Sequence, residues 1–327
     1  MKSKKIFITG GAGYVGTDLV EYLLIKGFII TVYDLLLYEN NLSKHKNLNV
    51  IRGDIRDIDK IRKSIIDHDI VIHLACISND PSFELNPELG KSINLDSFEP
   101  LVKVAREKKI NRFIYASSSS VYGIKDMKNV SEDVKLEPIT DYSKFKAECE
   151  QILASYKDDN FCTITVRPAT VCGYSKRQRL DVIVNILTNL GFHNKKITIF
   201  GGDQLRPNIH IKDMSRAYEL LINAPKNLVN GEVFNAGWEN RSVNDIALMV
   251  KNCLGPNIEL VVSKTNDNRS YHISSEKIKK ILNFNTKFTI IDAVNDLKIA
   301  FEKKLLVNPL SNPNFYNIKK MQIINLK

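Results

Sequence analysis

A tyrosine and a lysine four residues apart have side chains that together can move a proton. Tyr142 and Lys146 stand at i and i+4, so a helix through this segment places both on one face. A phenol with a pKa of about 10 is a poor base at neutral pH. A nearby ammonium favours the phenolate and lowers that pKa. Taken alone, the pair is equally typical of a helix surface, and it becomes a candidate general base and acid only together with the motifs described next.

Four consecutive serines, residues 117–120, precede this pair and follow an apolar run at 112–116. That run reads as a strand, and ligands of open parallel sheets bind beyond the carboxyl ends of strands. A serine hydroxyl at that edge can hydrogen-bond a substrate oxygen as charge develops on it. We therefore expect the serines and the Tyr142–Lys146 pair to share one site.

A glycine-rich loop joins the first apolar run, 5–9, to a segment with helical periodicity, 14–26. Gly10 permits a tight turn, Gly13 lets the main chain approach a pyrophosphate, and Gly16 lets the helix pack closely on the strand. The free N–H groups at the start of that helix favour phosphate. The loop predicts a dinucleotide site.

Asp34 ends the second expected strand, 28–33. A carboxylate there accepts hydrogen bonds from the ribose hydroxyls and repels a 2′-phosphate. The next three residues are leucines, so no arginine that could hold such a phosphate follows directly. These residues favour NAD over NADP.

Strands and helices alternate through the first 173 residues, which predicts βαβ units and a parallel sheet covered on both faces. Further strands are expected at 48–51, 70–74, 112–116 and 162–166, and helices at 58–66, 86–108 and 142–156. We predict a Rossmann-type doubly wound α/β domain over 1–173.

Beyond residue 173 the segments are shorter and mixed, which indicates a smaller α+β substrate-binding lobe over 174–327 with some segments returning to the first domain. Helices are expected near 181–190, 214–222, 243–254, 275–282 and 291–301, and strands near 197–200 and 233–235. The tail, 308–327, is rich in Asn and carries no pattern that assigns it a role.

The net charge of +10 over 327 residues is compatible with nucleic acid, an anionic membrane, a phosphorylated small molecule or a solvated lysine-rich surface. No nucleic-acid recognition motif accompanies it. The basic run 176–179 is interpreted as a loop that faces a nucleotide, with a solvated charge run as the alternative.

The five cysteines are widely spaced and form no C-x-x-C motif, so we expect neither a disulfide framework nor a metal site. Glycines interrupt the first apolar run too early for a signal peptide, and no stretch reaches the length of a membrane span. We expect a cytoplasmic protein without a membrane partner.

Taken together, these motifs resemble the extended short-chain dehydrogenase/reductase family, and within it the NAD-dependent nucleotide-sugar epimerases and dehydratases such as UDP-glucose 4-epimerase. The resemblance runs through nearly the whole chain. It rests on the glycine loop, the serine run, Tyr142 and Lys146, and on the short segments 53–57, 73–75, 93–95, 167–168 and 206–210.

The resemblance implies a role for individual residues. Tyr142 acts as base and acid, Lys146 holds the nicotinamide ribose, and Ser118 binds the reacting oxygen. The residues implied to bind NAD are Gly10, Gly13, Tyr14, Val15, Gly16, Asp34, Asp54, Ile55, Leu74, Ala75, Asn94, Ser117, Tyr142, Lys146 and Pro168. Those implied to bind the nucleotide-diphosphate sugar are Ser118, Asn185, Arg206 and Arg269.

The serine run also bears on the reaction. The 4,6-dehydratases of this family carry Thr-Asp-Glu where this chain has serines 118–120, and elimination of water needs those carboxyl groups. The resemblance therefore favours reversible oxidation at a sugar hydroxyl, most often C4, by an epimerase. The alternatives are a net 4-dehydrogenase or 4-ketoreductase and, less favoured, a dehydratase or a non-catalytic NAD-sensing protein.

Two segments differ from the family pattern, and two expected helices predict an oligomer. Thr170 stands where many members have Asn, and residues 78–81 are not general to the family, so we interpret them as shaping sugar specificity. The expected helices at 86–108 and 142–156 resemble the pair that forms the family's dimer interface. A homodimer is expected.

Overall fold

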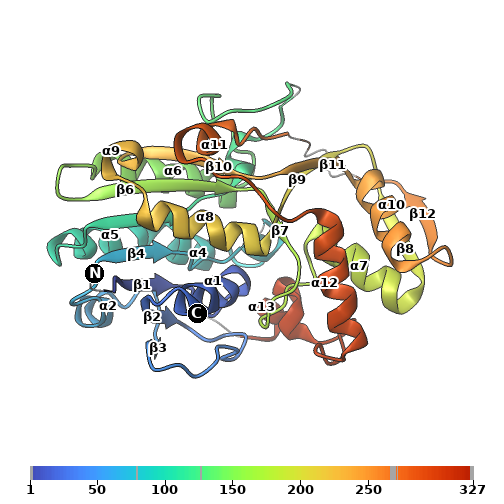
Figure 1. The fold of residues 1–327 in the computed structure, drawn as a ribbon, viewed down its shortest axis with the longest axis horizontal. Helices are drawn as coiled ribbons and strands as arrows, with labels where there is room; N and C mark the ends of the chain where they lie inside the picture. Colours follow the sequence, from blue (N-terminus) through green and yellow to red (C-terminus); the bar gives the residue numbers. More distant parts are fainter. Residues whose placement is uncertain (1–2, 79, 126, 266–269, 271, 325–327) are drawn as a thin grey trace.

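The computed structural model describes residues 3–78, 80–125, 127–265, 270 and 272–324. Within them, seven strands form one parallel sheet in the order β10-β6-β5-β4-β1-β2-β3 (Figure 1). The strands are β1 (Lys5–Thr9), β2 (Ile29–Asp34), β3 (Leu48–Arg52), β4 (Ile70–His73), β5 (Arg112–Ala116), β6 (Cys162–Pro168) and β10 (Glu232–Ala236). The predicted Rossmann-type α/β fold is confirmed.

Helices cover both faces of this sheet, which explains why its strands are nearly continuous apolar runs. Along β1, Ile6 and Ile8 face one buried cluster and Phe7 faces the other. The first face is covered by α1 (Tyr14–Ile25) and α8 (Ile211–Asn223), with α9 (Lys226–Val229) and α11 (Glu276–Leu282) near β10. The second face of the sheet is covered by α2 (Ile58–Ser64), α3 (Asp80–Glu84), α4 (Pro87–Lys91), η1 (Ser92–Asp96), α5 (Phe98–Glu107) and α6 (Asp141–Ser155).

The rest of the chain builds a smaller lobe beside the carboxyl edge of the sheet. Its strands form a three-stranded sheet, β7 (Thr170–Cys172), β9 (Leu205–His210) and β11 (Glu239–Ser242), and a pair, β8 (Lys196–Phe200) and β12 (Glu259–Ser263). The helices α7 (Ile183–Asn194), α10 (Val243–Leu254) and α12 (Ile290–Glu302) pack on one another (Figure 1). Capping boxes at Ser242 and Thr289 satisfy the first N–H groups of α10 and α12.

The tail returns to the large domain. After α12 the chain forms η3 (Pro313–Phe315) and α13 (Asn317–Ile323), which packs against α3. The amide of Leu180 donates to the carbonyl of Phe315 at 2.8 Å, and Met321 packs against the second buried cluster of the sheet. The tail thus lies beside the carboxyl edge of the large sheet, where ligands of such sheets bind.

The expected helical segment over 86–108 is present, but it is not one regular α-helix. Pro87 starts α4 behind an Asn86 cap, and η1 is a π-helical turn before α5 begins at Phe98. Asn94, inside that turn, uses its side chain to bond the main chain of Ile77 at 2.8 and 2.9 Å. Tertiary hydrogen bonding thus accompanies the break in the α-helical ladder, a pattern common at functional sites.

Four short strands of the lobe were not predicted: β7, β9, β11 and β12. β9 reads LRPNIH and β11 reads ENRS, so neither shows the alternation that marks a strand. Their strand conformation depends on pairing with each other, Glu239 opposite Asn208 and Ser242 opposite Leu205. No helix in the described ranges is long and apolar enough to cross a bilayer.

Candidate functional site

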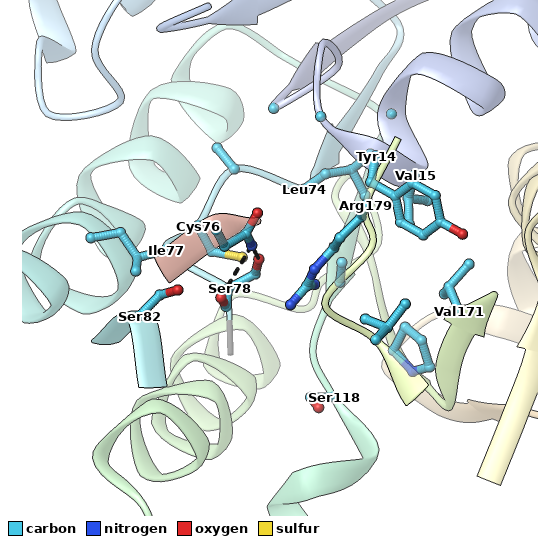
Figure 2. A pocket seen from close by; sticks show the side chains of 18 of the residues that line it. Tyr14, Val15, Leu74, Cys76, Ile77, Ser78, Ser82, Ser118, Val171 and Arg179 are labelled. Atoms are coloured by element: carbon cyan, nitrogen blue, oxygen red, sulfur yellow. Dashed lines mark hydrogen bonds between the residues drawn. The ribbon is translucent and has the colours of Figure 1, made fainter. Parts of the chain in front are cut away.

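One cavity of about 510 Å³ lies along the carboxyl edge of the large sheet, between it and the lobe. It opens where the strand order reverses around β1, which is where open α/β sheets bind ligands. Segments from both parts of the chain line it, including the glycine loop, the serine run, Tyr142 and Lys146. Figure 2 shows Tyr14 and Val15 of the first helix, Ser118 and Arg179 around this cavity. The three predicted catalytic residues and the glycine loop therefore line one cavity.

The glycine loop has the geometry that a dinucleotide needs. Gly10 has a φ of +73°, and a Cβ on it would stand 2.5 Å from the amide nitrogen of Ala75. A Cβ on Gly16 would stand 2.5 Å from the carbonyl oxygen of Gly10. The cap residue Gly13 supplies no side-chain hydrogen bond, and the first turn of α1 carries no acid. The helix N-terminus thus presents free N–H groups to an anion, as a pyrophosphate requires.

Asp34 lines the same cavity at the end of β2. Its two carboxylate oxygens accept the amides of Ala12 at 3.0 Å and Leu36 at 2.7 Å. Burial raises the pKa of Asp34, while these hydrogen bonds and the nearby Arg177 charge oppose the rise. Each oxygen retains a lone pair that a ribose hydroxyl can use. The residues present fit NAD.

Most other predicted cofactor residues line the cavity, and two do not. Tyr14, Val15, Ile55, Leu74, Ala75, Ser117 and Pro168 are on its wall. Asp54 lies outside the wall and is paired with Arg56 at 2.7 Å. Asn94 is buried and bonded to the main chain of Ile77, so it holds the segment after β4 rather than facing the cavity.

The predicted catalytic residues gather around Tyr142 at the start of α6. Burial, Cys76 and Asp80 raise the pKa of Tyr142, and the nearby Arg179 charge and Ser118 hydroxyl oppose that rise. The Lys146 nitrogen lies 5.8 Å from the centre of the Tyr142 ring. It donates to the carbonyl of Ala116 at 2.7 Å, and this bond anchors Lys146 to the end of β5.

The predicted substrate residues divide into three cases. Arg206 lines the cavity from β9. Asn185 is completely buried outside the wall and bonds the main chain of Gly173 and Arg179, at 2.9 and 2.8 Å, and the Tyr14 hydroxyl at 3.0 Å. It therefore braces the loop between the domains. Arg269 lies outside the described residues.

The basic run 176–179 supplies two cavity residues that were not among the predicted binding residues. Arg179 extends between Leu74 and Val171 toward Ser78 (Figure 2) and pairs with Asp181 at 2.6 Å. Arg177 stacks on the Tyr38 ring, 3.6 Å from its centre. Lys176, in contrast, points outward and pairs with Glu21. Only alternate members of the run face the cavity, which the run itself does not reveal.

The tail contributes the least expected residues. Asn317 accepts a hydrogen bond from Arg177 at 2.8 Å and donates to the Ser78 hydroxyl at 2.8 Å. The main-chain N–H of Asn317 donates to the Asp181 carboxylate at 2.8 Å. Asn317 and Met321 both line the cavity. No periodicity or motif in 308–327 signals this placement.

Within the described part of the chain, no group of three or more His, Cys, Asp or Glu could hold a metal ion. The five cysteines are free thiols.

Comparison with known proteins identifies the family of this chain. The model of the NAD dependent epimerase/dehydratase family matches residues 6–237. A dTDP-D-glucose 4,6-dehydratase from Dictyostelium discoideum is 30% identical over 76% of this chain and 62% of its own length. A UDP-glucose 4-epimerase from Lactobacillus helveticus is 26% identical over 89% of this chain and 94% of its own.

The fold has close relatives among solved structures. The UDP-glucose 4-epimerase of Thermotoga maritima, solved with UDP-glucose, superposes with a TM-score of 0.81 at 23% identity, covering 92% of this chain and 100% of that one. The family match extends from β1 through the end of β10, and so includes every strand of the large sheet. The chain therefore belongs to the NAD-dependent epimerase/dehydratase family, whose members are enzymes that use NAD as their cofactor.

Proposed function

We propose that this chain is an NAD-dependent nucleotide-sugar 4-epimerase, which oxidises a sugar hydroxyl transiently and reduces it again. The observation that carries the proposal is the meeting of Tyr142, Ser118 and Lys146 with the glycine loop in one cavity. Curated relatives include both epimerases and dehydratases, so the choice between these reactions depends on the residues of the cavity.

The side chains divide the proton chemistry among them. Tyr142 accepts the proton of the reacting hydroxyl and later returns it. Ser118, which lines the same cavity as Tyr142, stabilises the charge that develops on the same oxygen. When bound, NAD accepts the hydride from the sugar carbon and returns it to the opposite face of the keto sugar.

The serine run favours this reaction over dehydration. Ser119 is buried at 2% exposure, and the Ser120 hydroxyl donates to Ser118 at 2.9 Å. Neither position offers the carboxyl group that elimination of water needs. The two serines leave Tyr142 as the group that exchanges a proton with the sugar.

Guanidinium groups support a diphosphate substrate. Arg177, Arg179 and Arg206 all line the cavity. Arginine binds phosphate through two parallel hydrogen bonds, so such side chains suit a nucleotide diphosphate better than a neutral sugar. Because Arg177 lies beside Asp34, at the end assigned to the NAD ribose, we assign the diphosphate of the substrate to Arg179 and Arg206 and the sugar to the neighbourhood of Tyr142.

We also propose a homodimer through the face that carries α5 and α6. The two helices pack together on one side of the sheet, and the Tyr156 hydroxyl links them by donating to Glu99 at 2.6 Å. Light scattering of the purified chain tests this; a monomer contradicts it.

The decisive experiment incubates the protein with NAD and a panel of UDP-, GDP-, CDP- and dTDP-sugars. Product NMR and absorbance of reduced nicotinamide are followed together. An isomeric sugar without net NADH supports the epimerase. Stoichiometric NADH indicates a net 4-dehydrogenase, and a 4-keto-6-deoxy product indicates a dehydratase. No turnover of any sugar, with Tyr142→Phe indistinguishable from wild type, contradicts a catalytic role.

A further inference from the structure

Arg177 is a buried cation on the wall of the cavity. It lies in the loop between β7 and α7 and is 4% exposed. Its neighbour Arg179 is paired directly with the Asp181 carboxylate at 2.6 Å, whereas Arg177 donates to the neutral side-chain oxygen of Asn317 at 2.8 Å. The Arg177 charge is therefore available to a ligand in the cavity.

The hydrogen-bonding capacity of Arg177 is also incompletely used. A guanidinium group carries five N–H donors. In the described part of the chain, Nη2 bonds Asn317 and the buried Nε has no hydrogen-bond partner. Native proteins leave few buried donors unsatisfied, because each costs free energy. An oxygen atom of a ligand is the acceptor that this group lacks.

Two contacts hold the guanidinium in place without any ligand. Its carbon lies 3.6 Å from the centre of the Tyr38 ring, in the segment after β2. Asn317, in the tail, accepts from Nη2 and donates to the Ser78 hydroxyl at 2.8 Å. An arginine stacked on a ring and fixed at one end loses little freedom when it forms a further bond. The side chain is therefore preorganised.

Asp34 is the charged group at this end of the cavity. Burial lowers the pKa of Arg177, and the charge of Asp34 is among those that oppose the fall. The Asp34 oxygens accept hydrogen bonds from the amides of Ala12 and Leu36. Asp34 and Arg177 thus attract each other, and both line the cavity.

A ribose hydroxyl has the chemistry to join such a pair. It has one proton to donate and two lone pairs that accept. It can therefore donate to a carboxylate and accept from a guanidinium at the same time, and both hydrogen bonds are strengthened by charge. A 2′-phosphate, in contrast, has no such proton at neutral pH and is repelled by the carboxylate.

We propose that Arg177 binds the adenosine ribose of NAD together with Asp34, and that Asn317 is the positioning residue that holds Arg177 there. Although the loop after β7 carries it, Arg177 then reaches the cofactor end of the cavity. Bound NAD is held by both parts of the chain and secured by the tail. The inference goes beyond the proposed function, since it depends on the NAD site and not on the reaction.

The first test measures binding by calorimetric titration, without sugar or turnover. The ligands are NAD and ADP-ribose, which keeps the adenosine ribose and lacks nicotinamide. Arg177→Met should raise both Kd values about tenfold. Lys176→Met is the matched control, because Lys176 points outward and pairs with Glu21, and it should change neither. An unchanged Kd in Arg177→Met, or a rise for NAD alone, overturns the proposal.

The second test separates ribose binding from a merely structural role. It uses NAD analogues that lack the 2′- or the 3′-hydroxyl of the adenosine ribose. Removal of the bridging hydroxyl should weaken binding to wild type more than to Arg177→Met, because in the variant that hydroxyl has already lost one partner. Equal factors for both analogues overturn the assignment. A wild type that binds NADP as tightly as NAD, with Arg177→Met weakened for NADP alone, overturns it as well.

The third test concerns Asn317. Asn317→Ala leaves Arg177 in the chain and should raise the Kd for NAD about threefold. In the Arg177→Met background the same substitution should have no further effect, because Asn317 acts through Arg177. Additive effects overturn the positioning role. A protein that passes these tests and turns over no sugar contradicts the proposed function alone.

Discussion

The cavity has a sheet side, formed by Gly10, Gly13, Asp34, Ala75 and Ser118, and a lobe side, formed by Arg177, Arg179, Asp181, Arg206 and Asn317. On the sheet side, main-chain geometry at strand ends determines the shape, and its residues occur in short local motifs. On the lobe side, charged and polar residues of two distant segments, 177–181 and the tail, hold one another through hydrogen bonds. Backbone geometry thus prepares the cofactor end, whereas side-chain pairing prepares the end assigned to the substrate.

The largest expected effect separates chemistry from binding on the sheet side. Tyr142→Phe should lower kcat by roughly 10³-fold, about 4 kcal/mol, because general acid–base groups contribute on that scale. NAD affinity, measured by calorimetric titration, should not change, because the glycine loop and Asp34 remain. Loss of NAD affinity together with kcat would mean that the two functions of the sheet side cannot be separated.

Gly10→Ala tests whether main-chain geometry governs the sheet side. The variant should lose about 3 kcal/mol of unfolding free energy, since the new Cβ meets Ala75 in addition to the unfavourable positive φ. Gly27→Ala is the matched control. Gly27 also has a positive φ, +85°, but a Cβ added to it would meet no atom within 4 Å. It should lose only about 1 kcal/mol. Equal losses in urea denaturation would contradict the close approach.

The third prediction concerns the core beneath the sheet side. Burial, with the nearby Lys146 charge, lowers the pKa of His73 to about 3, so the folded protein keeps the imidazole neutral. The unfolded chain binds a proton below about pH 6.5, so folding stability should fall as pH decreases, by about 1.4 kcal/mol per unit.

The variant that checks this is His73→Gln, which retains a polar partner for Thr9 and does not titrate. Between pH 6 and pH 4 its unfolding free energy should depend less on pH than that of wild type, by about 2.7 kcal/mol in total. His45→Gln alters an exposed histidine and should keep the wild-type slope. An unchanged slope in His73→Gln would assign the acid sensitivity to other groups.

Arg206→Lys addresses the lobe side. Lysine keeps the charge and loses the planar fork, so KM for the nucleotide sugar should rise about tenfold while the Kd for NAD stays constant. Asp34→Asn is the converse variant and should weaken NAD binding with little effect on KM for the sugar. If both variants shift both constants, the two sides do not act separately.

The smallest expected effect concerns the tail. Asn317→Ala removes the side-chain bonds to Arg177 and Ser78 and should destabilise the docking of α13 by about 1 kcal/mol. Faster amide hydrogen exchange over 317–323 is the measurement. Asn285→Ala, which removes exposed bonds to Asn283 far from α13 in the chain, should leave that exchange unchanged.

Much of the sheet side could be predicted because its signals are local. The glycine spacing, the acidic end of β2 and the Tyr142–Lys146 pair each lie within one turn or one helix, and the structure brings them to one edge. The break at η1 could not be predicted, because it accompanies a contact between Asn94 and Ile77, which lie 17 residues apart. Asn185 was expected at the substrate, yet its side chain is occupied by the loop that it braces.

The sequence by itself determined the α/β class, the dinucleotide loop and the residues that move a proton, because steric and periodic constraints within a few residues are sufficient for these. Only the tertiary structure decided which members of the basic run enter the cavity and that the tail returns to it. These features join residues 140 to 239 positions apart. Their contacts arise when helices and strands pack, and no short-range pattern in the chain encodes them.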